Sequence, residues 1–117
     1  MLAALGQSTE REHQTVLGFS VLNHSKRAIE LLPPQLELSS SGNGHGPIKS
    51  EPVAITEYRL TARRLEPGQR ADGVVVFERP SFKESSERLE FRLAEADKVD
   101  QPITLQVSFT PFVGEKQ

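Results

Sequence analysis

The 117-residue sequence contains no cysteine, and this absence alone removes several kinds of chemistry. Without thiols the chain cannot form a disulfide bridge, a thiolate nucleophile or a cysteine-ligated zinc site. No apolar run approaches the roughly 20 residues that a membrane-spanning helix requires, so we expect no membrane span. The formal net charge of −2 gives no field that would favour nucleic acid as a partner.

The N-terminal residues 1–14 show neither a regular period nor an export signal. Met1 to Leu5 are apolar, but no basic residue precedes them, and the run is shorter than the roughly 7–15 residues of a signal-peptide core. We therefore predict a flexible N-terminal arm over residues 1–14, a single domain over residues 15–112 and a C-terminal tail over residues 113–117.

Several segments of the predicted domain alternate apolar and polar residues, which is the pattern of strands that bury one face. In residues 15–23, Leu17, Phe19 and Val21 share one side, and residues 103–109 alternate in the same way. Further strands are predicted at residues 29–38, 53–65, 73–77 and 88–93. The first of these should bend at Pro33-Pro34, because proline cannot donate to a β-ladder.

Strands in which apolar and polar residues alternate, without a long helical pattern, indicate antiparallel sheets that each have one solvent-exposed face. Two such sheets packed face to face predict an immunoglobulin-like antiparallel β-sandwich of about seven strands. A small β-barrel is the alternative. The aromatic residues expected to fill the core are Phe19, Tyr58, Phe77, Phe91 and Phe109.

The most patterned stretch is RLEPGQRADGVVVFERP, residues 64–80. Its glycines could cradle an anion, but no helix N-terminus follows to bind one. Pro67-Gly68 suits a type II turn, which takes proline at its second position and a positive φ at its third. We therefore interpret this stretch as a joint between two strands.

Together with FSVLN before it and LEFRL after it, this stretch resembles the bacterial telokin-like, immunoglobulin-fold domains of the DUF4352 type. The resemblance rests on two groups of residues, namely Val21 and Asn23, and Leu65, Pro67, Gly68, Gly73, Val76, Phe77 and Pro80. It implies an extracytoplasmic module of a bacterial lipoprotein or surface protein, with no catalytic residues.

The polar residues form no recognisable catalytic or cofactor-binding pattern. His13, His24 and His45 are far apart in the sequence, whereas a zinc site needs three or four convergent ligands. Serines are present, but none lies in a nucleophile-elbow context. We predict no enzyme activity, no catalytic, metal-binding or cofactor-binding residues, and no cofactor.

Three other groups of polar residues have a functional and a structural interpretation. Glu95, Asp97 and Asp100 lie close together but lack the calcium-loop signature, so a solvated turn is expected. Residues 23–25 match the N-glycosylation acceptor and equally suit a turn. Charges on the exposed face of residues 88–93 should form cross-strand pairs. The residues expected to pair are Arg88, Glu90 and Arg92 with Glu57, Arg59 and Arg63.

The sequence thus predicts a non-catalytic module for protein–protein interaction or structural support. An exposed strand edge or the glycine- and serine-rich loop would contact an unidentified protein partner. The loop residues are Ser40, Ser41, Gly42, Asn43, Gly44, His45 and Gly46. An inhibitor-like domain that presents a protruding loop to a protease is the alternative. We expect a monomer or weak oligomer, located in the periplasm or on the cell surface.

Overall fold

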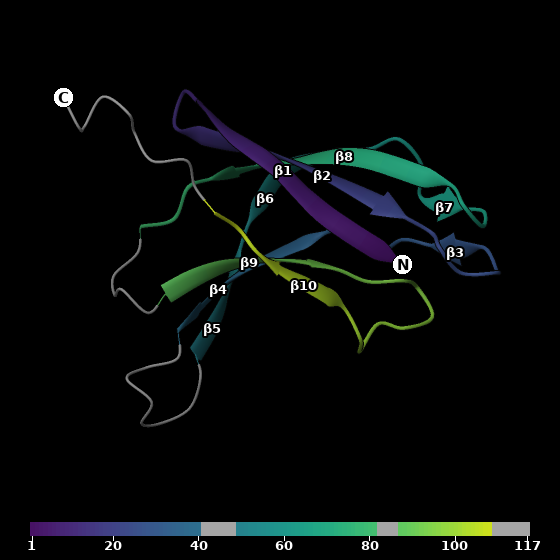
Figure 1. Cartoon of the computed structure of the whole chain (residues 1–117). Helices are drawn as coiled ribbons and strands as arrows, with labels where there is room; N and C mark the ends of the chain where they lie inside the picture. The colour runs from purple at the N-terminus through teal and green to yellow at the C-terminus, as the bar shows by residue number, and fades with distance from the viewer. Residues whose placement is uncertain (41–48, 82–86, 109–117) are drawn as a thin grey trace.

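The computed structural model describes residues 1–40, 49–81 and 87–108, in which all the regular structure is β-strand (Figure 1). The strands are β1 (Leu2–Arg11), β2 (Gln14–Leu22), β3 (Ile29–Glu30), β4 (Gln35–Ser40), β5 (Lys49–Val53), β6 (Ile55–Leu60), β7 (Arg64–Leu65), β8 (Arg70–Glu78), β9 (Glu87–Leu93) and β10 (Ile103–Gln106).

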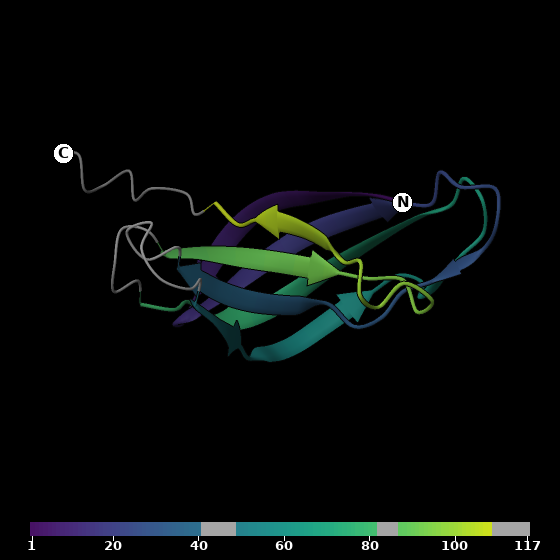
Figure 2. The same cartoon turned by 90° about the horizontal axis from the view of Figure 1, so that it is seen from below.

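Two four-stranded antiparallel sheets lie face to face (Figure 2). The β2 sheet has the order β1-β2-β8-β6, and the β9 sheet has the order β10-β9-β4-β5. This is the ABED and GFC arrangement of immunoglobulin domains, with β5 added beside the C strand. The predicted immunoglobulin-like sandwich is confirmed.

The chain passes from one sheet to the other at Ala54. β5 ends at Val53 on the edge of the β9 sheet, and β6 begins at Ile55 on the edge of the β2 sheet. The sequence predicted one continuous strand over residues 53–65, because the alternation of side chains continues through the crossing. Ala54, a single residue without a ladder partner, is therefore enough for the chain to pass from one sheet to the other.

The core consists of the inward-facing residues of β2, β4, β8 and β9, together with Ile29, Leu31, Leu65 and Val107. The rings of Phe19 from the β2 sheet and Phe91 from the β9 sheet lie 4.9 Å apart between centroids. Phe77 is also fully buried, as predicted. Tyr58 was expected in the core but is 37% exposed, because it lies on the edge strand β6. The predicted core residue Phe109 lies outside the described residues.

The N-terminal segment predicted as a flexible arm forms a strand instead. β1 pairs antiparallel with β2 along its length, from Leu2 opposite Leu22 to Arg11 opposite Gln14. A bulge between Leu5 and Ser8 adds one residue to β1, so the side-chain alternation changes phase there. This phase change, together with the exposure of most of β1, hid the strand from the sequence pattern.

Two predicted turns are confirmed by backbone geometry. Gly68 has a φ of 82°, and the N–H of Gln69 donates to the carbonyl of Glu66 at 3.0 Å, as a type II turn requires. The bend at Pro33-Pro34 separates β3, which pairs with β7, from β4, which belongs to the β9 sheet. Both features bring loops together at the same end of the sandwich (Figure 1).

Candidate functional site

The predicted interaction loop lies largely outside the described residues. Ser40 is the last residue of β4, where it is buried and lies opposite Lys49 of β5 and Glu87 of β9. The other predicted loop residues, 41–46, are not among the described ones. Their role in binding therefore stays a prediction, and so does the inhibitor-like alternative that depends on the loop.

Asn23 is fully buried and joins the loops at one end of the sandwich. Its Nδ2 donates to the carbonyl oxygens of Arg27 at 2.8 Å and Leu65 at 3.0 Å. Its Oδ1 accepts from the backbone N–H of Ser25 at 3.0 Å and from the Ser25 hydroxyl at 2.6 Å. The backbone of Asn23 makes two further hydrogen bonds to residues 68–69. The glycosylation motif is thus inaccessible in the folded protein, and its asparagine is structural.

The acidic and histidine side chains of the described residues do not converge on one site. Within residues 1–40, 49–81 and 87–108, no three His, Asp or Glu side chains are grouped so that they could hold a metal ion. Asp97 forms an exposed ion pair with Arg27 at 3.1 Å. Glu95 is buried and pairs through its backbone with Leu31. These contacts give the acidic residues 95–100 a structural role in the turn.

The outer face of the β9 sheet is charged, and an arginine on it contacts two carboxylates. The Nη1 of Arg92 lies 2.9 Å from the Glu37 carboxylate, and its Nη2 lies 3.3 Å from the Glu90 carboxylate. Glu37 and Glu90 are directly opposite each other on β4 and β9, where two like charges would repel. Arg92 offsets this repulsion by contacting both.

The cross-strand ion pairs predicted from the sequence are wrong. Glu57 and Arg59 lie on β6, in the sheet that does not contain Arg92, and pair with each other at 3.2 Å. Side-chain alternation identified the exposed faces of these strands. It contains no information on which strands become neighbours, and therefore not on which charges meet.

The outer face of the β2 sheet is, by contrast, largely uncharged over β1, β2 and β8. We define the uncharged face by the uncharged outward residues of the three strands, as given by their register; the charged outward residues Arg11, Arg70, Asp72 and Glu78 lie at its ends. They are Leu2, Ala4 and Thr9 of β1, Val16, Gly18, Ser20 and Leu22 of β2, and Val74 and Val76 of β8. Leu2 is 55% exposed, which makes it one of the most exposed large hydrophobic residues. An exposed apolar patch of this kind is typical of an interaction surface.

The four edge strands differ in how well they are protected against pairing with another chain. β5 contains Pro52, β6 carries Glu57 and Arg59 and is bulged, and β10 has four residues. β1 is bulged between Leu5 and Ser8, as β6 is, but it has ten residues, no proline and no charge from Leu2 to Thr9. Within the described residues β1 forms a ladder with β2 alone, so its second edge is open to a partner strand.

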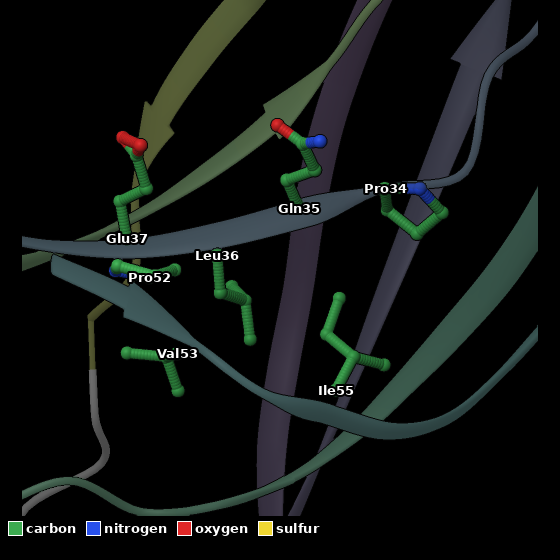
Figure 3. Close-up of a pocket in the computed structure, with 7 residues that line it drawn as sticks. All are labelled: Pro34, Gln35, Leu36, Glu37, Pro52, Val53 and Ile55. Atoms are coloured by element: carbon green, nitrogen blue, oxygen red, sulfur yellow. The ribbon is translucent and has the colours of Figure 1, made fainter.

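Two hollows lie on either side of Gln35. The first, about 390 Å³, is formed where β5 leaves β4, and it has an apolar wall of Leu36, Val53 and Ile55 (Figure 3). Gln35 and Glu37 point away from that wall. The second hollow, about 280 Å³, lies between the loop before β4 and the loop after β9. Its lining residues are Leu32, Pro33, Gln35, Arg92, Leu93, Ala94, Val99 and Pro102.

Two of these features were not predicted from the sequence. β1 was hidden by its bulge and by the run of apolar residues from Leu2 to Leu5, in which no polar residue alternates. The hollow at Arg92 lies between two loops that are some 60 residues apart in the chain, and no local sequence pattern predicts that these loops meet.

The fold is an immunoglobulin-like β-sandwich. Comparison with known proteins finds structures that are similar to it in fold. No protein-family model matches the chain, and no curated protein matches it significantly. A chain of the archaellum periplasmic stator protein complex of FlaF and FlaG from Sulfolobus acidocaldarius is similar, with a TM-score of 0.50 and 14% identity. That match covers 92% of this chain and 90% of the other. The stator protein FlaG from the same organism also matches, with a TM-score of 0.49 and 14% identity, over 91% of this chain and all of that one.

Proposed function

We propose that the chain is a non-catalytic immunoglobulin-like module that binds another protein within an extracytoplasmic or surface assembly. The observation that carries the proposal is the combination of the open β1 edge with the uncharged face beside it. An open edge offers backbone N–H and C=O groups to an added strand, and the apolar residues next to it contribute buried area. Natural β-proteins protect long edges of this kind unless a partner covers them.

The charges that border the uncharged face indicate what kind of partner would fit. Arg70 and Asp72 pair with each other at 2.9 Å, and Arg59 pairs with Glu57 at 3.2 Å. Because these charges are already paired, a partner need not supply countercharges. We therefore expect a partner with an uncharged strand or sheet face.

Two further observations support this proposal. The neighbour with a TM-score of 0.50 is described as part of a periplasmic complex of two stator proteins, which gives a precedent for this fold in a protein assembly. The turn at Pro67-Gly68, on which the resemblance to telokin-like, DUF4352-type domains partly rests, is present in the structure. Membership of that family, its bacterial source and its extracytoplasmic location are part of the proposal. Among the described residues there is no helix long and apolar enough to cross a bilayer.

Ala4→Lys should strongly reduce partner capture while leaving the domain folded. Ala4 is exposed on the outer face of the open edge strand, so lysine can be accommodated there, but it would place an unpaired charge inside the proposed interface. The measurement is affinity capture from an extract of the cells that produce the chain, followed by quantitative mass spectrometry. A partner bound by the wild type should fall by about tenfold or more with Ala4→Lys.

Gln106→Lys is the matched control. It also adds a lysine to the outer face of an edge strand, but on β10, opposite Glu90 and in place of the amide that accepts from Arg88 at 3.1 Å. A partner that is retained by Gln106→Lys and lost with Ala4→Lys supports the proposal. A partner retained equally by both variants, or the absence of any specific partner of the wild type, would contradict it.

A further inference from the structure

The open edge of β1 restricts the kind of strand that can pair with it. Within the described residues β1 pairs with β2 alone, so the backbone N–H and C=O groups that point away from β2 have no strand partner (Figure 2). The strand is bulged, because Leu5 and Ser8 are three residues apart whereas their partners on β2 are only two residues apart. A strand added at the open edge has to accommodate this irregularity.

The ladder with β2 fixes the face to which each residue of β1 points. Residues directly opposite each other in an antiparallel pair point to the same face. The inward residues are therefore Ala3, Leu5, Ser8 and Glu10, and the outward residues are Leu2, Ala4, Thr9 and Arg11. Counted from the bulge toward either end of β1, the order is the same, namely inward, outward, inward, outward.

A strand with regular alternation cannot follow this order on both sides of the bulge. Two of its residues that share a face are an even number of positions apart, whereas Leu5 and Ser8 share a face three positions apart. A regular strand would therefore leave an extra residue on β1, as β2 does. Bulges of this kind discourage pairing at an edge. A second β1 that runs antiparallel has the same three-residue step, so neither strand is left with an extra residue.

The register of such a pair follows from the central position of the bulge. Gly6 of one copy faces Gln7 of the other, and the remaining facing pairs are Leu5 with Ser8, Ala4 with Thr9, Ala3 with Glu10 and Leu2 with Arg11. Every pair combines two inward or two outward residues. No charge faces a like charge, which would be destabilising. The aliphatic part of Arg11 lies beside Leu2 of the other copy, which is 55% exposed in the single chain.

We propose that β1 pairs with β1 of a second copy of this chain, about a two-fold axis at Gly6 and Gln7, and so joins two β2 sheets into one continuous sheet. A two-fold interface makes every contact twice, which the mirrored order of faces in β1 allows. The inference rests on the proposed function in that it takes the same open edge and identifies the uncharged partner strand as that of a second copy. The two uncharged faces then form one surface, which remains accessible to a different protein.

Single cysteines test this register cleanly, because the chain has no cysteine of its own. Ala4→Cys and Thr9→Cys both change exposed side chains, so both variants should fold. The two variants are mixed under mild oxidation. We expect the disulfide between positions 4 and 9 to form about tenfold or more faster than that of either variant with itself, since only directly opposite residues reach disulfide geometry.

Ala4→Cys mixed with Gln106→Cys is the control for random collision, because Gln106 is also exposed but lies on the edge strand β10 of the other sheet. The inference is overturned if the pair at positions 4 and 9 reacts no faster than this control, or if Ala4→Cys reacts with itself as fast as with Thr9→Cys. Sedimentation equilibrium of the wild type should show a dimer, and a monomer at all concentrations up to about 1 mM would also overturn the inference.

Affinity capture separates this inference from the proposed function. A different protein that the wild type captures and that Ala4→Lys loses supports the proposed function, even when no disulfide forms between positions 4 and 9. The absence of any such protein contradicts the proposed function, even when that disulfide forms.

Discussion

Replacing Asn23 by alanine should lower the free energy of unfolding by about 3 kcal/mol, measured by urea denaturation, because a fully buried amide loses several hydrogen bonds at once. The carbonyl of Leu65 would lose its donor, the Nδ2 of Asn23, which lies 42 residues away in the sequence. Each group left buried without a partner costs about 1–3 kcal/mol, more than the net value of the bond itself. The loss should therefore exceed that of an exposed hydrogen bond several-fold.

Ser25→Ala is the matched control for this prediction. It removes the hydroxyl, whose oxygen lies 2.6 Å from Asn23 Oδ1 and 2.9 Å from the Arg27 carbonyl oxygen and has one proton to donate, but it keeps the backbone N–H that donates to the same Oδ1. We expect a loss of about 1 kcal/mol from this variant. If Asn23→Ala were no more destabilising than Ser25→Ala, the buried amide would not hold the loops together.

Gly73→Ala should be the second strongly destabilising change, lowering the free energy of unfolding by about 3 kcal/mol, at the upper end of overpacking effects. A Cβ at position 73 would lie 2.4 Å from Cζ of Phe19 and 2.7 Å from the carbonyl oxygen of Arg59. The ring cannot move away freely, since it packs on Phe91 in the opposite sheet. The backbone oxygen cannot move without disturbing the β6–β8 ladder.

Gly18→Ala is the control, because Gly18 lies on the neighbouring strand β2, opposite Val74, and faces outward. The nearest atom to its added Cβ would be the carbonyl oxygen of Gly73 at 3.9 Å, an ordinary contact. The free energy of unfolding of Gly18→Ala should remain within about 0.5 kcal/mol of the wild type or rise slightly. Phe19→Leu should make Gly73→Ala less costly, which a double-mutant cycle would measure as a favourable coupling. Additive effects would contradict a clash with the Phe19 ring.

The sequence predicted those elements whose cause is local. Leu17, Phe19 and Val21 alternate because β2 buries one face, and all three are buried in the structure. The turn at Pro67-Gly68 follows from the φ preferences of those two residues alone, and its geometry is as expected. Local rules of this kind sufficed to predict the sandwich.

The elements that were missed depend on contacts between distant segments. β1 is a strand because β2 offers it a ladder, while its own pattern is interrupted by the bulge between Leu5 and Ser8. Arg92 pairs with Glu37 because β4 and β9 are neighbours, which side-chain alternation cannot reveal. For the same reason the open edge, the uncharged face and the hollow beside Arg92 became visible only in the folded structure.

The central claim is that the chain binds a partner protein through β1 and the uncharged face of the β2 sheet. Site-specific photo-crosslinking in the cells that produce the chain tests it most directly, with benzoylphenylalanine placed at position 4 on β1 or at position 106 on β10. Both positions are exposed on edge strands, but of different sheets. The account predicts a discrete covalent adduct with one protein from position 4 and none from position 106. No adduct from position 4, or the same adducts from both positions, would contradict it.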